Sequence, residues 1–438
     1  MKYYSTNKKA PIATLEKAVV KGLAEDKGLY MPEHIKALPK EFFDNCQKMS
    51  FQEIAYQVAD AFFGEDVDAE SLKNIVYDTL QFDCPVVPVN NDNIYTLELF
   101  HGPTLAFKDV GARFMARLLQ YFLKKEGKLD HEHQVNVLVA TSGDTGSAVA
   151  NGFLGVEGIH VYVLYPKGKV SPIQECQFTT LGQNITAVEV DGVFDDCQAL
   201  VKSAFMDEQL NQHMKLTSAN SINVARFLPQ AFYYFNAYAR MKERGLADQL
   251  VMCVPSGNFG NICSALFGKR MGLPVKRFIA ANNANDIFYK YLQTGKYEPK
   301  PSVQTIANAM DVGDPSNFAR IYDLYKADHA AICQDISGAT YRNEQIEQTM
   351  KQCYSDNGYV LDPHGACGYQ ALCDLLQPGE VGVFCETAHP AKFKDTVDRI
   401  LSSDIEIPAR LRAFMQGEKQ SVSMSKEFAD FKAFLLAE

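Results

Sequence analysis

The sequence lacks the paired cysteines and clustered histidines that mark disulfide-stapled or zinc-binding proteins. Its 11 cysteines are scattered singly, with no Cys-x-x-Cys pair, so we expect neither a disulfide framework nor a zinc site. Cys253 and Cys385 lie in apolar surroundings and are typical of buried thiols in a cytosolic protein. His131 and His133 are close together, but they lie in a polar loop and we take their spacing as incidental. We therefore expect no metal ion and a cytoplasmic location.

Long apolar runs and an excess of positive charge are also missing. No segment approaches the ~18 consecutive apolar residues needed to cross a bilayer, and residues 1–10 contain no apolar signal segment. We expect no membrane partner. The formal net charge of −10 argues against nucleic-acid binding, because neutralising a phosphate backbone requires a basic face. A small anionic ligand is not excluded, since local groups decide its binding.

The chain does contain enough apolar material for a large core. Its 438 residues are 47% hydrophobic and 22% charged, which suggests roughly two or three domains. We expect a mainly helical N-terminal domain at residues 1–85, with amphipathic helices at 51–59 and 69–80. Residues 86–438 then form the larger region. It opens with a hairpin formed by two β-type runs between Cys84 and Leu99.

From residue 135 onward, apolar runs typical of buried strands alternate with helical patterns. Strands are expected at Val135 to Ala140, Val161 to Tyr165, Ile185 to Val190, Lys215 to Thr217, Gln249 to Pro255, Val275 to Ala280 and Val381 to Cys385. The intervening helices include one at 227–241 and one that Ser171 caps. This alternation predicts an α/β fold of doubly wound, mainly parallel sheets, with ligands at the carboxyl ends of the strands. Residues 282 to about 360 are more polar and are expected to form an insertion or an outer layer.

Lys108 stands at the end of the segment Leu-Phe-His-Gly-Pro-Thr-Leu-Ala-Phe-Lys-Asp. Gly102 and Pro103 interrupt regular structure there, and a strong helical pattern follows, for which Asp109 is the expected N-cap. The positive end of a helix disfavours an ammonium, so Lys108 is suited to act as a neutral amine that attacks a carbonyl. Considered alone, a solvated surface lysine is the commoner explanation.

Two glycine-rich segments directly follow expected strands. Thr-Ser-Gly-Asp-Thr-Gly begins at Thr141 and leads into a helix, so it offers free N–H donors for a carboxylate or a phosphate. Within it, Asp144 would repel an anion and should face a cationic or hydroxyl group. Ser-Gly-Asn-Phe-Gly-Asn begins at Ser256 and can cradle a phosphate through its backbone. It lacks the Gly-Lys-Ser/Thr of a nucleotide P-loop. For both segments, a purely structural turn remains the alternative.

Two further polar segments complete the set of candidate binding elements. Glu-Thr-Ala-His-Pro follows the strand that ends at Cys385, and Thr387 could offer a neutral hydroxyl to a ligand nitrogen. A capping role is the commoner alternative for Thr387. Residues 218–226 contain Asn220, Ser221 and Arg226 before a helix, which is typical of a second anion site. The alternative is a capped helix start with a solvated Arg226.

In this order, the motifs around Lys108, Thr-Ser-Gly-Asp-Thr-Gly, Pro-Ser-Gly-Asn-Phe-Gly-Asn and Thr-Ala-His-Pro-Ala-Lys-Phe closely resemble those of the threonine synthase family. Tyr3-Tyr4-Ser5-Thr6 and Gly28-Leu29-Tyr30-Met31-Pro32 match its long, N-terminally extended branch, so the resemblance covers nearly the whole chain. It implies the tryptophan-synthase-β fold, known as fold type II, of pyridoxal-phosphate enzymes. Two αβ subdomains should surround a cofactor cleft beside the helical N-terminal domain. Lys27 departs from the Gly-Gly-Leu pattern of the family without catalytic consequence.

The resemblance also implies a role for each candidate residue. Lys108 would hold pyridoxal 5'-phosphate as a Schiff base, and Thr387 would meet the pyridine nitrogen. The cofactor phosphate would be bound by Gly257, Asn258, Phe259, Gly260 and Asn261. Asp144 takes the place near the ring hydroxyl where shorter relatives carry asparagine. The substrate carboxylate would be held by Ser142, Gly143 and Thr145, and the substrate phosphate by Asn220, Ser221 and Arg226.

The implied reaction is a β,γ-replacement, the last step of threonine biosynthesis. O-phospho-L-homoserine and water would give L-threonine and phosphate, which makes the enzyme a lyase acting on a phosphate ester. The substrate is a small molecule, and we expect a monomer or a homodimer. Two alternatives remain: a pyridoxal-phosphate-dependent threonine or serine dehydratase, and a non-catalytic homologue that binds a phosphometabolite. A segment within 282–330 is a candidate for closing over the substrate.

Overall fold

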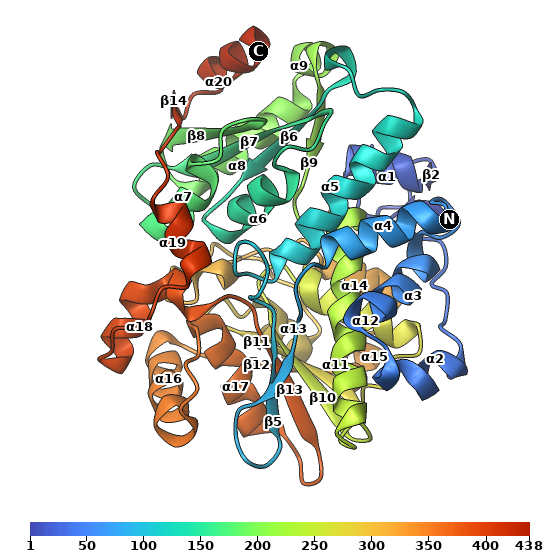
Figure 1. The fold of residues 1–438 in the computed structure, drawn as a ribbon, viewed down its shortest axis with the longest axis vertical. Coiled ribbons are helices and arrows are strands. Elements are labelled where there is room, and N and C mark those ends of the chain that lie inside the picture. Colours follow the sequence, from blue (N-terminus) through green and yellow to red (C-terminus); the bar gives the residue numbers. More distant parts are fainter.

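Three sheets organise the chain in the computed structural model, which describes residues 1–438. Figure 1 shows a five-stranded sheet in the upper half of the molecule and a six-stranded sheet in the lower half, with the N-terminal helices along one side. We call the two halves the upper lobe and the lower lobe. No helix is both long enough and apolar enough to span a bilayer.

The upper lobe contains a wholly parallel sheet. Its strand order is β14 (Val422–Ser425), β8 (Ile185–Asp191), β7 (Ile159–Pro166), β6 (Val135–Ala140) and β9 (Lys215–Ser218). Its helices are α5 (Lys108–Lys125), α6 (Asp144–Phe153), α7 (Pro172–Thr179), α8 (Phe194–Met206), α9 (Glu208–His213) and α20 (Phe428–Ala437). Val137 packs in the core that contains α5 and α6, whereas Leu138 packs with α8 and α20. Both faces of this sheet are therefore covered, as expected of strands with continuous apolar runs.

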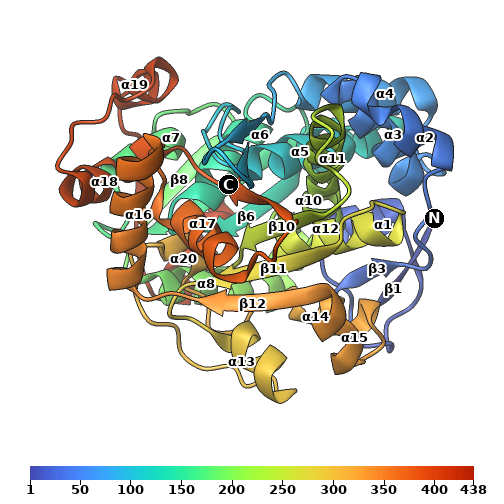
Figure 2. The same ribbon diagram turned by 90° about the horizontal axis from the view of Figure 1, so that it is seen from below.

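The lower lobe contains a mixed sheet. Its strand order is β12 (Ile336–Thr340), β11 (Arg277–Asn282), β10 (Leu250–Pro255), β13 (Val381–Glu386), β5 (Ile94–Glu98) and β4 (Val86–Pro88). All neighbours are parallel except β4 and β5, which confirms the expected hairpin. The helices of this lobe are α11 (Ala231–Glu243), α12 (Gly260–Arg270), α13 (Ile287–Thr294), α14 (Phe318–Leu324), α15 (His329–Asp335), α16 (Asn343–Asn357), α17 (Pro363–Leu375) and α18 (Lys394–Leu401). Helix α19 (Ala409–Met415) packs against α7 of the upper lobe. Figure 2 shows α16 and α17 on one side of the sheet and α11 and α12 on the other.

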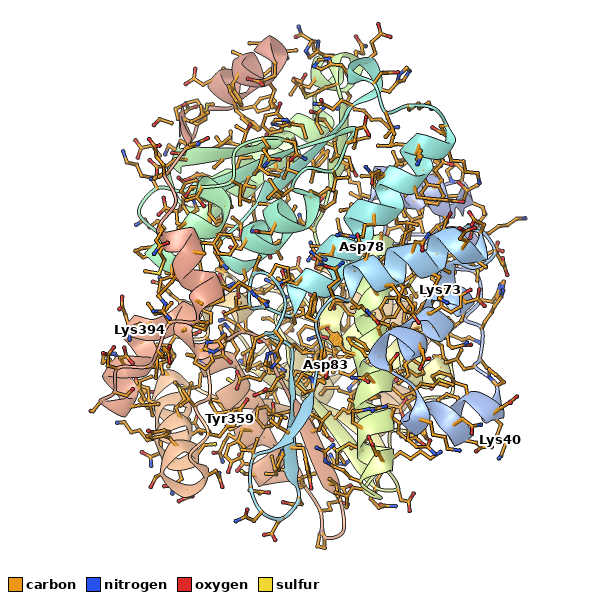
Figure 3. The ribbon with its side chains drawn as sticks, in the orientation of Figure 1. Lys40, Lys73, Asp78, Asp83, Tyr359 and Lys394 are labelled. Atoms are coloured by element: carbon orange, nitrogen blue, oxygen red, sulfur yellow. The ribbon has the colours of Figure 1, made fainter.

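The first 85 residues combine four helices with a small antiparallel sheet. The elements are β1 (Lys2–Ser5), β2 (Ala13–Thr14), α1 (Leu15–Lys21), β3 (Tyr30–Pro32), α2 (Lys40–Asn45), α3 (Phe51–Phe63) and α4 (Ala69–Thr79). The two expected helices are present, and Ser50 begins α3 with a capping box. Charged side chains such as Lys40 and Lys73 line the exposed side of these helices (Figure 3). On the inner side, the rings of Phe63 and Phe114 lie 5.0 Å apart, so this part shares its core with α5.

Three expectations about local structure need correction. Asp109 is not an N-cap: α5 begins at Lys108 after Phe107 and has no side-chain cap. The segment 282–360 is not only an insertion or an outer layer, because β12 pairs in parallel with β11 as the edge strand of the sheet. The sequence Ile-Ser-Gly-Ala-Thr of β12 is short and carries little apolar signal.

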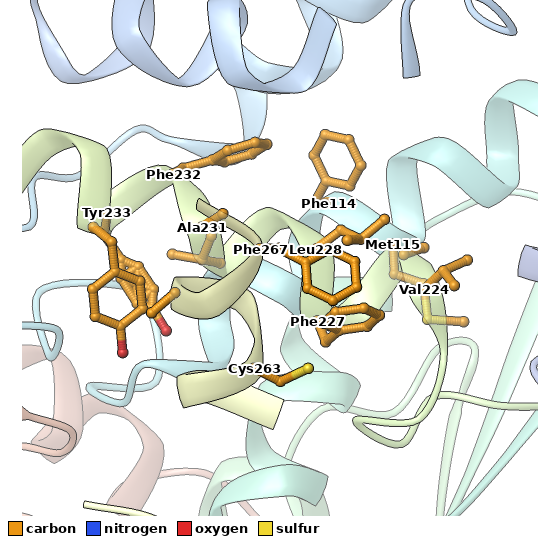
Figure 4. Close-up of a cluster of buried hydrophobic side chains, with 14 of the residues drawn as sticks. Phe114, Met115, Val224, Phe227, Leu228, Ala231, Phe232, Tyr233, Cys263 and Phe267 are labelled. Carbon is orange, nitrogen blue, oxygen red and sulfur yellow. The ribbon is translucent and has the colours of Figure 1, made fainter. Parts of the chain in front are cut away.

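The expected helix at 227–241 is also shorter than predicted. Its first part divides into α10 (Val224–Phe227) and the 3₁₀ turn η3 (Leu228–Gln230), where Pro229 lacks the N–H that an α-helix needs. Figure 4 shows that side chains on both sides of this break are packed in the core. Phe227, Phe232 and Phe267 lie with Phe114 in one buried apolar cluster.

Candidate active site

Lys108 is placed by a direct pairing between two loops. The Phe107 N–H donates to the carbonyl of Thr387 at 2.8 Å, and the His389 N–H donates to the carbonyl of Leu105 at 3.0 Å. These bonds form a short antiparallel bridge between the segment before α5 and the segment after β13. The loop is held from within by Asp109, whose carboxylate accepts both the N–H and the hydroxyl of Thr104, at 2.9 and 2.6 Å. The first turn of α5 therefore begins beside the carboxyl end of a central strand of the lower lobe.

The amine of Lys108 contacts α6, a neighbouring helix of the upper lobe. Lys108 Nζ donates a hydrogen bond to Thr145 Oγ1 at 2.9 Å. Burial lowers the pKa of Lys108 to about 8, and this lowering is opposed by the nearby Asp144 and reinforced by Arg226 and Lys392. Roughly a tenth of the amine is therefore unprotonated at pH 7, and this neutral form is what a nucleophile or a proton acceptor requires. The alternative of a solvated surface lysine is wrong.

A side chain of the loop at the start of α6 pairs two of the loop's own N–H groups. Thr141 Oγ1 accepts the N–H of Gly143 at 3.0 Å and the N–H of Gly146 at 2.8 Å. Ser142, which lies between Thr141 and Gly143 in the sequence, is exposed. The N–H groups of Ser142, Asp144 and Thr145 have no partner in the chain, so they are available to an anion at this helix start.

Asp144 lies within a buried polar group. Its Oδ1 is 2.5 Å from Lys392 Nζ and accepts from Gln174 Nε2 at 3.0 Å. Burial would raise the pKa of Asp144, but Lys392, Lys108 and Gln174 together hold it at about 2. The expectation that Asp144 faces a cation is confirmed. Neither Lys392 nor Gln174 was predicted from the sequence, although Lys392 lies within the Thr-Ala-His-Pro-Ala-Lys-Phe motif.

The loop that follows β10 leaves its backbone donors free. None of the N–H groups of residues 257–262 donates to another group of the chain. Phe259 adopts a left-handed conformation, with φ of 66°, which turns the chain into α12. The loop takes Gly257 close to the backbone of a neighbouring segment, where a Cβ would lie 2.8 Å from the carbonyl oxygen of Ala309. Such an array of free donors at a helix N-terminus is an anion-binding cradle.

Asn261 adds one side-chain donor to this cradle. Its Oδ1 accepts the hydroxyls of Tyr233 and Tyr234 at 2.5 and 2.7 Å, whereas its Nδ2 is buried without a partner. Because an unpaired buried donor costs about 1–3 kcal/mol, an oxygen-rich ligand is the natural partner of Nδ2. Asn258 differs, because its side chain is exposed.

The loop is supported by residues from the polar segment 282–360 and by contacts between that segment and His364 of α17. None of these residues was predicted from the sequence to belong to the site. The Asn317 N–H donates to the carbonyl of Asn258 at 3.1 Å, and Asn317 Nδ2 donates to Ser221 Oγ at 3.4 Å. Arg320 Nη1 in turn donates to Asn317 Oδ1 at 2.8 Å. His364 Nε2 accepts the N–H of Ala309 at 3.1 Å. Part of this segment, which is a candidate for closing over the substrate, is thus packed against the loop that follows β10.

Residues 218–226 lie next to the same loop. A Cβ on Gly260 would come within 3.2 Å of Ser221 Cβ, and both Asn220 and Ser221 are half-buried. Arg226 is only 1% exposed, so the alternative of a solvated arginine is wrong. Its Nη1 donates to the carbonyl of Ala219, and its Nε is buried without a partner. Burial lowers the pKa of Arg226 to about 10, opposed by Asp109.

Thr387 occupies the end of β13. Its side chain is 7% exposed, and its carbonyl is used by the Phe107 N–H. Its hydroxyl makes no hydrogen bond within the chain, so it does not cap a helix. His389 caps the following turn η5 (Pro390–Phe393) instead. The hydroxyl of Thr387 is therefore free for a ligand atom.

Comparisons with known proteins assign this arrangement. Three family models match: "Threonine synthase N terminus" over residues 2–80, "Pyridoxal-phosphate dependent enzyme" over residues 80–383, and "Threonine synthase, C-terminal" over residues 365–435. Threonine synthase of Haemophilus influenzae is 43% identical over 437 residues, with 100% of both chains covered. The chain belongs to the threonine synthase family. The threonine synthase of Escherichia coli is 41% identical over 436 residues, covering 100% of this chain and 99% of the relative.

Solved structures agree with this membership. The crystal structure of threonine synthase from Escherichia coli has a TM-score of 0.91 and 40% identity, with both chains covered fully. The threonine synthase from Brucella melitensis, solved with bound pyridoxal phosphate, has a TM-score of 0.92 and 34% identity, covering 100% of this chain and 99% of that one. Maize serine racemase, at 14% identity and a TM-score of 0.53, shares the fold alone. The predicted fold type II architecture is confirmed.

The residues present fit pyridoxal 5'-phosphate, the cofactor of the threonine synthase family. Lys108 offers an amine with a lowered pKa, the 257–262 loop offers unpaired N–H donors, and Asn261 offers an orphaned buried Nδ2. These are the groups that an aldehyde and a phosphate require.

Proposed function

We propose that this chain is a lyase that converts O-phospho-L-homoserine and water to L-threonine and phosphate. Membership of the threonine synthase family over the whole length supports the proposal. The observation that carries it is the partly unprotonated amine of Lys108, which is hydrogen-bonded to Thr145 where the two lobes meet. A non-catalytic homologue would have no use for such an amine.

The cofactor would be held from both lobes. Lys108 would bond its aldehyde carbon, and the hydroxyl of Thr387 would face the ring nitrogen. The loop Gly257, Asn258, Phe259, Gly260 and Asn261 would bind its phosphate through the free N–H groups. When bound, the cofactor supplies an electron sink for negative charge at the substrate Cα. Asp144 lies one residue from Thr145, and its charge is balanced by Lys392, so the ring hydroxyl would not face an unpaired carboxylate.

The substrate would be oriented by the two remaining polar segments. Ser142, Gly143 and Thr145 stand at the start of α6, where free N–H groups suit a carboxylate. Asn220, Ser221 and Arg226 would hold the substrate phosphate, for which the buried Arg226 keeps one unpaired N–H. The two sites fix the ends of a bifunctional anion, so Cα is presented to the lysine in a defined orientation.

Lys108 then acts as the base. Its unprotonated Nζ would accept the Cα proton of the bound substrate, and Thr145 Oγ1 holds the amine in place. As the Cγ–O bond breaks, the Cβ proton would leave with the phosphate as hydrogen phosphate. Water would then add its hydroxyl group to Cβ, and its remaining proton, together with the proton held by Lys108, would go to Cα and Cγ to give L-threonine. The buried surroundings of Lys108, Asp144 and Arg226 limit side reactions with solvent.

The proposal extends to the domain division, the partners and the oligomeric state of the chain. We infer a chain divided near residue 85 into an N-terminal domain and a catalytic region, active on a small molecule without nucleic-acid or membrane partners. The net charge of −10 supports the absence of a nucleic-acid partner. Its working state is a cytoplasmic monomer or homodimer, which sedimentation of the purified chain would test.

Replacing Lys108 with Ala tests the function directly. Phosphate release from O-phospho-L-homoserine and formation of threonine should both fall at least a thousandfold, since nucleophile and base are lost together. Lys124→Ala, an exposed substitution on the same helix, is the matched control and should keep full activity. Release of 2-oxobutyrate from threonine at a higher rate than phosphate release would support a dehydratase instead.

A further inference from the structure

A buried ion pair joins the two lobes beside the lysine. Lys392 belongs to η5 of the lower lobe and Asp144 to α6 of the upper lobe. Their side chains are 0% and 6% exposed, and Nζ lies 2.5 Å from Oδ1. Lys392 Nζ also donates to the carbonyl of Thr104 at 2.8 Å, and Gln174 Nε2 donates to Asp144 at 3.0 Å. The pair is therefore fixed by four separate segments of the chain.

Stability alone is a poor explanation for this pair. Moving two charges out of water costs more than most buried pairs regain, and apolar residues of similar volume often replace them without loss. A buried pair at a candidate active site is better explained by its effect on neighbouring charge. The neighbour in question is Lys108, because Asp144 directly precedes Thr145, which accepts the hydrogen bond from Lys108 Nζ at 2.9 Å.

Charged groups face Lys108 from three elements. Asp144 on α6 favours the ammonium form of Lys108, whereas Lys392 on η5 and Arg226 on α10 disfavour it. Asp109, the next residue on α5, is occupied by the two hydrogen bonds from Thr104. With Lys392 in place, Asp144 is largely compensated. Without Lys392, the largest charge effect on the amine would come from the uncompensated carboxylate of Asp144.

We propose that Lys392 is a positioning residue that neutralises Asp144 and thereby keeps the amine of Lys108 free to bond the cofactor aldehyde. The inference rests on the proposed function only in taking Lys108 as the attachment residue. In that step the Lys108 nitrogen bonds the aldehyde carbon, and the aldehyde oxygen leaves as water with the two amine hydrogens. An ammonium has no lone pair for this step, so the rate follows the fraction of neutral amine.

Three variants test the charge balance. The full-length chain is stripped of cofactor, mixed with pyridoxal 5'-phosphate at pH 6 to 10, reduced with borohydride at intervals and digested, and the label at Lys108 is counted by mass spectrometry. In the wild-type chain the labelling rate should rise with pH, with a midpoint near 8. Lys392→Met should move this midpoint up by about one pH unit and Asp144→Asn should move it down by about one.

The double variant gives the decisive comparison. With both charges removed, the midpoint should return close to that of the wild-type chain, because the two shifts have opposite sign. Lys392→Arg keeps the charge and should keep the profile. Lys432→Gln is the control, since it breaks a 2.8 Å ion pair with Asp207 in a different part of the upper lobe and should leave the midpoint unchanged.

The outcomes separate this inference from its competitors. If Lys392→Met and Asp144→Asn shift the midpoint in the same direction, or leave it unshifted in folded protein, the ion pair only holds the two lobes together. Either result would overturn the proposal. If Lys392→Met does not fold, the downward shift of Asp144→Asn and the unchanged profile of Lys392→Arg still decide the matter. Absence of label at Lys108 in the wild-type chain would instead defeat the proposed function.

Discussion

Two loops that follow parallel strands approach the same site in opposite ways. The loop before α6 binds two of its own N–H groups through Thr141 Oγ1 and presents charged and hydroxyl side chains. The loop before α12 leaves the N–H groups of 257–262 unpaired and presents mainly backbone. The loop before α6 is therefore stabilised by its own Thr141 side chain. The loop before α12 is instead held by contacts with Asn317 and Ala309 of a neighbouring segment.

The difference shows how one cleft can serve two kinds of anion. A phosphate that stays bound through many turnovers suits an array of backbone donors, which have no side-chain freedom to lose. A substrate that enters and leaves suits a loop whose shape persists when it is empty. Substitutions in the α12 loop should therefore affect cofactor affinity, and substitutions in the α6 loop should affect folding stability and substrate binding.

The largest effect is expected from Asn261→Asp. The variant keeps an acceptor for Tyr233 and Tyr234 but replaces the orphaned Nδ2 donor with a carboxylate oxygen. Repulsion from a phosphate should weaken cofactor binding by about a hundredfold, as measured by absorbance titration with pyridoxal 5'-phosphate. Ser256→Ala is the control, because its hydroxyl donates only to the carbonyl of Val254. Equal losses in both variants would contradict the assignment of Asn261 to the phosphate cradle.

Thr141→Val tests whether the loop before α6 is stabilised by its own Thr141 side chain. The N–H groups of Gly143 and Gly146 would lose their acceptor, and the free energy of unfolding should fall by about 2 kcal/mol. Urea denaturation measures this change, and Thr141→Ser should restore most of the loss. Cofactor affinity should change little. A large loss of cofactor affinity at unchanged stability would reverse the distinction between the loops.

Gly257→Ala tests the close approach between the loop before α12 and the backbone at Ala309 and Met310. The new Cβ would lie 2.8 Å from Ala309 O and 3.0 Å from Met310 Cα, so one backbone segment must shift. Cofactor affinity should fall by about tenfold, which corresponds to about 1.4 kcal/mol of strain. Gly260→Ala meets looser contacts of 3.2 and 3.3 Å and should lose less. A larger loss of cofactor affinity in Gly260→Ala would mean that the contact with Ser221, and not the contact with Ala309, holds the loop in place.

The smallest effect is expected from His364→Phe. The ring would keep its place beside Phe393 but lose the Nε2 acceptor for the Ala309 N–H, which loosens the segment over Gly257. It would also lose the 2.5 Å contact between Nδ1 and the buried Asp362 Oδ2, so the free energy of unfolding should fall as well. One neutral hydrogen bond is worth about 1 kcal/mol, so cofactor affinity should fall by about fivefold. Phe393→Leu removes the ring contact and keeps the hydrogen bond, and it should leave affinity nearly unchanged. An equal loss in Phe393→Leu would assign the effect to packing.

Much of the fold could be predicted from local patterns. The strand Val135–Ala140 has the predicted bounds, because a continuous apolar run can only be buried on both faces. Ser171 with Pro172 begins a helix as predicted, since both act within one turn. The N-cap at Asp109 was predicted wrongly because its carboxylate bonds Thr104 across the Gly-Pro turn. The strand β12 was missed because its place in the sheet comes from β11 and not from its own composition.

The candidate site divides in the same way. The motifs around Lys108, Thr141 and Ser256 were visible because each couples glycine or hydroxyl residues to the end of an apolar run. The partners Lys392, Gln174, Asn317 and Arg320 were not, because each comes from a segment distant in sequence whose role depends on docking.

By itself, the sequence determined the strand and helix order, the placement of loops at strand ends and the chemical groups that those loops carry. These features depend on hydrogen bonding and burial within about ten residues, so the local pattern contains them. Tertiary structure alone decided that Lys108 is partly unprotonated, that Asp144 is paired and that Arg226 is buried. Charge states depend on which groups lie within a few ångströms and on how little water remains, and only the packing of the two lobes sets both.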